Sequence, residues 1–536
     1  MTKPSMPNID LNPHDWTEVK RILERYVPQY DVWVFGSRAT WTAKAYSDLD
    51  LVIITDTRLP LATLADLKAA FDESDLSVKV DIVDWATTGE AFREIIRKTA
   101  IVVRDAVTEE LKGWSARTLE DCMEAIIDYR GKTPEKTSSG IPLITAKVVK
   151  GGRIEPTDEY IAFEDYDSWM RRGLPKAGDV VMTTEAPLGE IAQLGPERVA
   201  LAQRLITLRG NPSILDNTFL KFLMQSSDVQ EQLHARASGT TVLGIKQSEL
   251  RKITLTLPPL DEQHAIANIL GTLDDKIELN RRMNVTLETM ARALFKAWFV
   301  DFEPVRAKVE GRDTGLPKEI ADLFPDSFED SELGDVPKGW RVGKLGDIAN
   351  NPRRGIQPDA ITPETPYIGL EHMPRRCIAL SDWGHPEELG SNKYKFNRGD
   401  VLFGKLRPYF HKVGVAAVDG VCSTDIVVVT PKKQEWFGFL LGHISSVDFV
   451  EYTNAGSTGT KMPRTSWHEM ARYTVALPTV SIADKYTSMI LPMIENTFVN
   501  IHESRTIAAQ RDVLLPKLLS GKLRSIGAGL IVSGNM

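Results

Sequence analysis

Several features that mark secreted, metal-binding or membrane proteins are scarce in this sequence. Its 536 residues hold only three cysteines (Cys122, Cys377 and Cys422), which are far apart and form no CxxC pair. We therefore expect neither a disulfide framework nor a zinc knuckle, and a reducing cytoplasm is the simplest location. The nine histidines show no HExxH spacing, which argues against a zinc enzyme. No run of 18 apolar residues occurs and the first residues have no apolar core, so neither a membrane partner nor a signal peptide is expected.

Cofactor-binding loops are missing as well. The sequence has no Walker A motif GxxxxGK[ST], no Gly-rich cofactor loop and no NPPF or NPPY motif of adenine methyltransferases. ATP-driven movement and methyl transfer are therefore not expected of this chain. The net charge of −8 also argues against unspecific coating of nucleic acid. Much of this charge lies in residues 1–110, which carry 13 Lys or Arg and 19 Asp or Glu.

A chain of this length and ordinary composition predicts three or four globular domains. An internal repeat runs through most of it, at an offset of about 220 residues. Four segments recur in the same order, and they pair as follows: Trp114–Asp121 with Trp340–Asp347, Gly178-Asp179-Val180 with Gly399-Asp400-Val401, Ser238–Thr241 with Ser457–Lys461, and Leu257-Pro258 with Leu477-Pro478. Short β-rich runs at 179–183, 204–208, 401–403 and 426–429 predict a strand-rich domain in each copy.

Each copy ends in a long helical pattern with one apolar stripe. The first pattern begins at Asp261, a suitable N-cap, and carries apolar residues at three- and four-residue steps as far as Trp298. The second begins near Ser481 and stops near Gly521. Two such stripes need partners, which favours two helices packed on each other as an antiparallel coiled coil. The alternative is two ordinary core helices in independent domains.

Motifs along this region resemble those of type I restriction–modification specificity subunits. Pro258–Gln263 resembles the opening of that family's first conserved helix, and Leu294–Phe302 resembles its end. Gly334–Trp340 resembles the entry to the second target-recognition domain, and Leu514–Leu523 the C-terminal conserved helix. The resemblance covers residues 111–525. One departure is Ser481-Ile482-Ala483, where the first copy has Asp261-Glu262-Gln263.

The resemblance implies a DNA-reading subunit that is not itself catalytic. Each target-recognition domain would read one half of a bipartite double-stranded DNA site. The helices would act as a ruler and dock two copies of an adenine-specific DNA methyltransferase subunit, and an endonuclease–translocase subunit could join them. A modification-only reader without a nuclease is an alternative. The implied multidomain α+β fold comprises a target-recognition domain at 111–258, a helix at 259–302, a linker at 303–335, a second domain at 336–478, a helix at 479–525 and a tail at 526–536.

Candidate DNA contacts follow from residue chemistry. Base edges and phosphates are met by Arg, Lys, small hydroxyls and amides on loops. In the first repeat the candidates are Arg130, Lys132, Lys147, Thr240, Thr241 and Lys246. In the second repeat they are Arg353, Arg354, Lys405, Arg407, Tyr409, Thr460, Lys461 and Arg464. A solvated surface role is the alternative for any single one, and the loop that recurs in both repeats favours binding.

A different constellation precedes the repeats. The strand-like run Asp31–Phe35 leads into Gly36-Ser37, and Asp48-Leu49-Asp50 follows after ten residues. Asp48 and Asp50 alternate on the second expected strand, and Asp81 lies on a third. Three such carboxylates can hold Mg²⁺ against a nucleoside triphosphate. Gly36 would let the backbone approach the phosphates, Ser37 would donate a hydrogen bond to them, and Arg38 would supply a counter-charge.

This set resembles the minimal nucleotidyltransferases, which share a reduced polymerase-β-like fold and the pattern GSx10DxD. The resemblance covers roughly residues 15–107 and implies an α/β domain over 1–110, with Gly36, Ser37, Asp48, Asp50 and Asp81 in the catalytic site and the three aspartates as metal ligands. A retained fold without catalysis is an alternative. In that family the transferred group is often AMP and the acceptor a protein or small molecule. A rival reading of the whole chain is a nucleotidyltransferase that acts on a protein partner and is delivered to DNA by the repeats.

Overall fold

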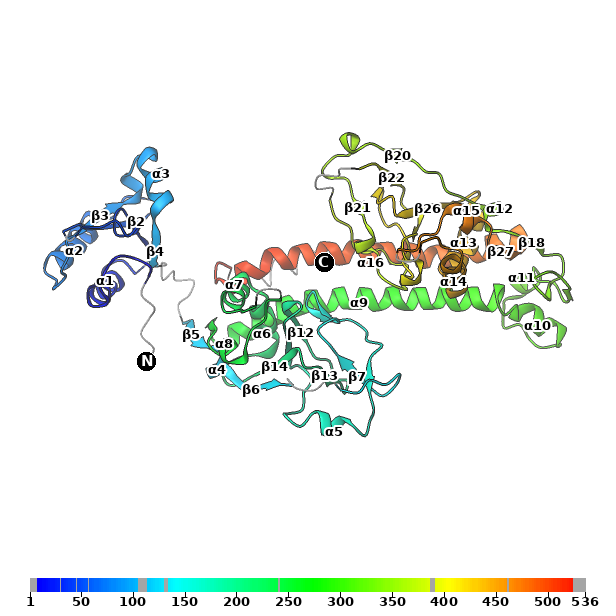
Figure 1. Ribbon diagram of the computed structural model, residues 1–536, viewed down its shortest axis with the longest axis horizontal. Coiled ribbons are helices and arrows are strands. Elements are labelled where there is room, and N and C mark those ends of the chain that lie inside the picture. The colour runs from blue at the N-terminus through cyan, green and yellow to red at the C-terminus, as the bar shows by residue number, and fades with distance from the viewer. Residues whose placement is uncertain are drawn as a thin grey trace. The chain divides into compact units, whose positions relative to one another are not determined.

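The fold is described from a computed structural model, shown in Figure 1. It covers residues 7–28, 30–44, 46–55, 57–104, 113–129, 134–239, 242–385, 391–459 and 462–523. These residues divide into two compact units, one within Met1–Gly271 and Asp512–Met536 and the other within Thr272–Arg511. No helix in the described ranges is long and apolar enough to cross a membrane.

The N-terminal domain is a four-stranded sheet with three helices. The sheet order is β3-β2-β1-β4, with β2 and β3 parallel and the other pairs antiparallel. Its elements are α1 (Pro13–Tyr26), β1 (Asp31–Phe35), β2 (Leu49–Ile54), α2 (Leu61–Asp72), β3 (Val80–Asp84), the 3-10 turn η1 (Trp85–Thr87), α3 (Glu90–Thr99) and β4 (Ile101–Arg104). Alternate residues of β1 and β2 fill the core with the buried face of α1, and this core includes Val32, Val34, Leu49 and Leu51. The expected strands are thus present, although Asp48 lies just before β2 rather than within it.

The first repeat is built from short strands and short helices. Its main sheet has the order β12-β11-β14-β6. Its elements are β5 (Ser115–Thr118), α4 (Leu119–Cys122), β6 (Met123–Asp128), β7 (Ile141–Ile144), β8 (Val149–Lys150), β9 (Arg153–Ile154), β10 (Tyr160–Ile161), α5 (Tyr166–Trp169), β11 (Val180–Thr184), β12 (Leu188–Gln193), β13 (Ala200–Leu201), β14 (Leu205–Gly210), α6 (Asn217–Gln225), α7 (Ser227–Ala235), α8 (Gln247–Leu250) and β15 (Thr254–Leu257). All five residues of β11 are buried.

The second repeat follows the same plan. Its elements are β18 (Arg341–Lys344), α12 (Leu345–Ile348), β19 (Ala349–Asn350), β20 (Gly355–Ile356), η3 (Pro358–Ala360), β21 (Tyr367–Ile368), η4 (Leu370–His372), β22 (Lys393–Phe396), β23 (Val401–Gly404), η5 (Pro408–Phe410), β24 (Val413–Val415), β25 (Gly420–Cys422), β26 (Ile426–Pro431), η6 (Gln434–Trp436), α13 (Phe437–Ile444), α14 (Val447–Ala455), α15 (Trp467–Ala471) and β27 (Thr474–Leu477). Its sheet order β24-β23-β26-β19 reproduces β12-β11-β14-β6 strand for strand. Likewise β27 pairs with β18 as β15 pairs with β5. The repeat seen in the sequence is therefore a repeat of topology.

Each repeat is followed by a 40-residue helix, α9 (Leu260–Phe299) and α16 (Val480–Leu519). Each begins one residue before its expected cap, so Asp261 and Ser481 lie in the first turn instead of at the N-cap. Within the second unit the two helices lie side by side (Figure 1). The Tyr486 hydroxyl donates to the Ala291 carbonyl at 3.0 Å, and the Asn280 amide donates to Ser504 at 3.3 Å. Contacts therefore run in opposite order along the two helices, whereas a coiled-coil form of the packing stays a prediction.

The segment expected to be a linker has its own elements. It contains α10 (Glu303–Val309), α11 (Lys318–Ala321) and β16 (Phe328–Glu329), which pairs with β17 (Val336–Pro337). Val305, Ile320 and Phe324 are buried in the same core as Trp298 and Trp340. Residues 303–335 therefore pack against the end of α9 and the start of the second repeat.

Candidate functional site

In the N-terminal domain, β-pairing brings the expected catalytic residues together. Asp50 lies opposite Phe35 on one side and opposite Asp81 on the other, because β2 pairs with both β1 and β3. Gly36 follows directly after β1 with φ of +75°. A Cβ atom at Gly36 would lie only 2.3 Å from Oδ2 of Asp50. Both the left-handed backbone and this close approach therefore require glycine at position 36.

The carboxylates influence one another electrostatically. Partial burial, followed by the charges of Asp81 and Asp48, raises the pKa of Asp50. A divalent cation would relieve crowded negative charge of this kind, and carboxylate oxygens are ligands that Mg²⁺ prefers. In the described ranges no group of three or more His, Cys, Asp or Glu side chains is arranged as a metal-binding cluster. Asp81 pairs with Lys79, Nζ to Oδ1 at 3.1 Å. The metal role of the three aspartates stays a prediction.

Arg38 holds the loop between Gly36 and Asp48. Its side chain is buried, and its guanidinium donates to the carbonyl of Ser47 at 2.7 and 3.0 Å and to that of Asp10 at 2.7 Å. The expected counter-charge role is thus secondary, because the donors are used on backbone oxygens. Arg38 still lowers the pKa of Asp50, although burial and the two other aspartates outweigh it.

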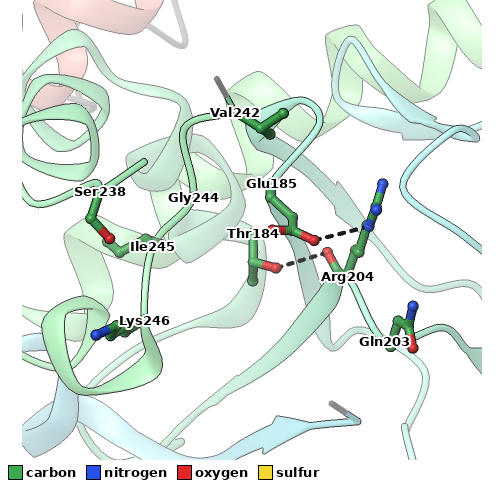
Figure 2. A pocket seen from close by; sticks show the side chains of 9 residues that line it. All are labelled: Thr184, Glu185, Gln203, Arg204, Ser238, Val242, Gly244, Ile245 and Lys246. Atoms are coloured by element: carbon green, nitrogen blue, oxygen red, sulfur yellow. Dashed lines mark hydrogen bonds and ion pairs between the residues drawn. The ribbon is translucent and has the colours of Figure 1, made fainter. Parts of the chain in front are cut away.

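In the first repeat, a hairpin-like segment docks onto the end of β11. The Ser238 and Gly244 backbones exchange hydrogen bonds of 2.9 and 3.0 Å, and the Ile245 N–H donates to the Thr184 carbonyl at 3.0 Å. We call these three bonds the strand-end frame. Beside it lies an open pocket of about 390 Å³, lined by Thr184, Glu185, Gln203, Arg204, Ser238, Val242, Gly244, Ile245 and Lys246 (Figure 2).

The second repeat builds the same strand-end frame about 220 residues later. The Thr458 and Arg464 backbones exchange hydrogen bonds of 3.0 and 2.9 Å, and the Thr465 N–H donates to the Lys405 carbonyl at 3.0 Å. The Arg407 N–H also donates to the Pro463 carbonyl at 2.7 Å. Three of the residues expected to contact DNA, Lys405, Arg407 and Arg464, are therefore brought together here.

The other expected DNA contacts are placed as follows. Arg130, Lys132, Thr240, Thr241, Thr460 and Lys461 lie outside the described residues. Lys246 is exposed beside the frame, and Lys147 lines a smaller pocket that shares Gln203 and Arg204 with the first, its Nζ 3.4 Å from Glu159. Tyr409 is exposed and stacks edge-on against Phe410. Arg353 is exposed, whereas Arg354 is paired with Asp400 at 2.9 Å.

Sequence reasoning missed three side chains that accompany the frames, Glu185, Arg204 and Asp425. Glu185 pairs with Arg204 at 2.9 Å in the first repeat, and Asp425 pairs with Arg464 at 3.2 Å in the second. The repeat gives no signal for these pairs, because an offset of 221 residues aligns Arg204 with the acidic Asp425 and Glu185 with the apolar Leu406. What the sequence does not give is the pairing across strands.

Comparison with known proteins agrees with both constellations. The family described as "Type I restriction modification DNA specificity domain" matches residues 112–289, and the family described as "Polymerase beta, Nucleotidyltransferase" matches residues 17–107. The MjaIX type I restriction enzyme specificity subunit of Methanocaldococcus jannaschii is 27% identical over 77% of this chain and 94% of its own length. The chain therefore carries a type I restriction–modification DNA specificity domain and, before it, an N-terminal nucleotidyltransferase domain.

The two parts of the chain have separate relatives. The probable protein adenylyltransferase MntA of Haemophilus influenzae is 50% identical over 19% of this chain and 89% of its own length. A crystal structure of an S subunit from M. genitalium aligns over 76% of this chain and 96% of that one, with a TM-score of 0.45 and 16% identity. Both parts lie in one chain, at residues 17–107 and from residue 112 onward.

Proposed function

We propose that the two repeats read the two halves of a bipartite double-stranded DNA site. The observation that carries this proposal is the recurrence of the strand-end frame, bond for bond, in repeats of equal topology. Each frame presents basic and polar side chains at the end of a buried strand, where they can reach base edges and phosphates. Two equivalent reading surfaces in one chain suit a site with two separated halves.

In this proposal α9 and α16 set the distance between the halves. The helices would also carry two adenine-specific DNA methyltransferase subunits, and an endonuclease–translocase subunit could join the complex. The relatives named as type I specificity subunits support this assignment. DNA reading with these partner subunits would take place in the cytoplasm, where the chromosome lies.

A spacer experiment tests the bipartite reading. The full chain, with its methyltransferase subunits, is bound to a duplex that carries its selected site. One base pair is then added to or removed from the non-contacted spacer. We expect loss of binding in both cases, because about 3.4 Å and a tenth of a helical turn move one half out of reach. Unchanged binding to both altered duplexes would contradict reading by two linked surfaces.

For the N-terminal domain we propose metal-dependent transfer of AMP from ATP to a protein hydroxyl. Asp48, Asp50 and Asp81 would hold Mg²⁺, which when bound screens the triphosphate charge. Gly36 leaves room for the Asp50 carboxylate, and Ser37 would donate to a phosphate oxygen. The acceptor hydroxyl gives its proton to solvent, a bond forms between its oxygen and the α-phosphorus, and the bond from the α-phosphorus to pyrophosphate breaks. The 50% identity to a probable protein adenylyltransferase supports this class of reaction.

Label transfer tests this second part. The full chain and its partner subunits are incubated with Mg²⁺ and α-labelled ATP. We expect label on a protein with the native chain and none with the double variant Asp48→Ala/Asp50→Ala. The matched control is Asp66→Ala/Asp72→Ala, which removes two exposed carboxylates from α2 of the same domain. Equal labelling by both double variants would contradict the assigned site.

A further inference from the structure

The two strand-end frames carry different side chains on the same backbone. In the first repeat the Thr184 N–H donates to the Arg204 carbonyl at 2.9 Å, and in the second the Lys405 N–H donates to the Asp425 carbonyl at 2.9 Å. Positions 204 and 425 are therefore equivalent, yet one is basic and the other acidic. A constant backbone with variable side chains is what a reading surface needs in order to distinguish two DNA sequences.

Each frame nevertheless contains one arginine with the same kind of support. Arg204 starts beside β14, and its Nε lies 2.9 Å from Oε1 of Glu185 (Figure 2). Arg464 belongs to the docked segment, and its Nε donates to Oδ1 of Asp425 at 3.2 Å. At the equivalent positions 204 and 425, the first repeat has the arginine and the second has the carboxylate. In both repeats the ion pair is made through the arginine Nε.

The use of Nε leaves the outer edge of both guanidinium groups available. Within the described part of the chain, the hydrogen bonds include none from the terminal amino groups of Arg204 or of Arg464, and the ion pair of each arginine is made through Nε. Both side chains are about half exposed, at 51% and 45%. By contrast, Arg209 uses a terminal amino group on Asp179 and is largely buried.

The free edge has a well-defined chemical preference. Two parallel N–H donors on a planar guanidinium match the O6 and N7 acceptors of guanine in the major groove. A carboxylate on Nε fixes the plane of the group, which reduces the entropy lost on binding. A lysine could keep the charge and donate hydrogen bonds, but not from a rigid planar fork.

We propose that Arg204 and Arg464 each read a guanine, one in each half of the DNA site, and that Glu185 and Asp425 hold them in position. This inference rests on the proposed reading of DNA by the two repeats. It names the base class for one position in each half-site. It also assigns a positioning role to the two carboxylates.

The test is selection of random duplex DNA by the full chain with its methyltransferase subunits. We expect the native chain to select one bipartite motif with a guanine in each half. Arg204→Ala should lower the preference for one of these guanines roughly 10- to 100-fold and leave the other half unchanged. Arg464→Ala should do the same in the opposite half.

Lysine variants separate base reading from phosphate contact. Arg204→Lys and Arg464→Lys should keep affinity for unselected DNA but weaken the guanine preference, because the ammonium lacks the fixed planar fork. Glu185→Gln and Asp425→Asn should weaken the same preference by a smaller factor. The matched controls are Arg198→Ala and Arg341→Ala, which remove exposed, ion-paired arginines elsewhere in each repeat and should leave the motif unchanged.

Three outcomes would overturn the proposal. The alanine variants could keep the native motif, or they could lower affinity equally for all sequences, or the lysine variants could retain the guanine preference. A native chain that selects no bipartite motif would instead refute the reading of DNA on which the inference rests. A variant counts as folded when its thermal unfolding midpoint equals that of the native chain.

Discussion

Asn500 on α16 donates a hydrogen bond to Asn284 on α9, with Nδ2 and Oδ1 2.8 Å apart in the buried interior of the helix pair. A second bond joins Asn280 to Ser504 at 3.3 Å. The repeat offset of 220 residues relates Asn280 to Asn500 and Asn284 to Ser504. The two bonds are therefore equivalent in the internal repeat, and they are related to each other by a local twofold axis.

The hydrogen bond between Asn284 and Asn500 leads to a prediction about the free energy of unfolding. Asn500→Leu should lower the free energy of unfolding by about 1–3 kcal/mol, because it leaves the Asn284 amide buried without its partner. The double variant Asn284→Leu/Asn500→Leu should be less destabilised than the sum of the two single variants, because both polar groups are then gone. Urea unfolding of the four proteins measures this coupling. Strict additivity would show that the hydrogen bond contributes nothing.

Gly36 offers a sharp test of the N-terminal site. Gly36→Ala places a methyl group where Oδ2 of Asp50 lies, on a backbone with φ of +75°. We expect label transfer from ATP to be lost while DNA selection by the repeats is retained. Gly89→Ala is the control, because a Cβ atom there meets no atom within 4 Å. Full transfer by the Gly36 variant would refute the close packing at this site.

The pH dependence of stability should depend on His443. This imidazole lies among Phe295, Phe439 and Tyr473, and its Nε2 has no hydrogen-bond partner among the residues that the structure describes. Burial lowers its pKa to about 3. Because the folded-state pKa is below the unfolded value of about 6.5, its contribution to stability is complete above pH 6.5. It is lost progressively as the pH falls from 6.5 towards 3, by at most about 1.4 kcal/mol per pH unit.

His443→Phe removes the titrating group and keeps a ring in the aromatic cluster. We expect the variant to lose less stability than the native chain when the pH is lowered from 7 to 5. Urea unfolding midpoints at the two pH values measure the difference. The same loss in both proteins would show that His443 is not held neutral by burial.

Much of the fold was predictable because its local signals agree with its packing. The expected strand at 179–183 is β11 at Val180–Thr184, and the expected strand at 401–403 is β23. Apolar runs bounded by Gly or Pro gave these limits to within one residue. The helix starts were missed by one residue, because Pro259 and Thr479 precede the first turns and the expected caps lie inside them.

The candidate sites were less predictable, because their chemistry comes from contacts across strands. Arg38 resembles a counter-charge in the sequence, but burial directs its donors to the carbonyls of Ser47 and Asp10. The pairing of Arg204 with Glu185 requires β11 and β14 to be neighbours, which no local pattern reveals. Comparison of the two repeats in the structure is what relates the pair Arg204–Glu185 to the pair Arg464–Asp425.

In our proposal, DNA reading and nucleotidyl transfer are separate activities of one chain. The most direct test maps methylated adenines made by the full chain and its methyltransferase subunits, with native Asp48 and Asp50 or with Asp48→Ala/Asp50→Ala. We predict the same bipartite methylation sites for both proteins, although the double variant no longer transfers label from ATP. Loss or change of the methylated sites in the double variant would contradict this account and favour an enzyme for which the repeats only supply the substrate.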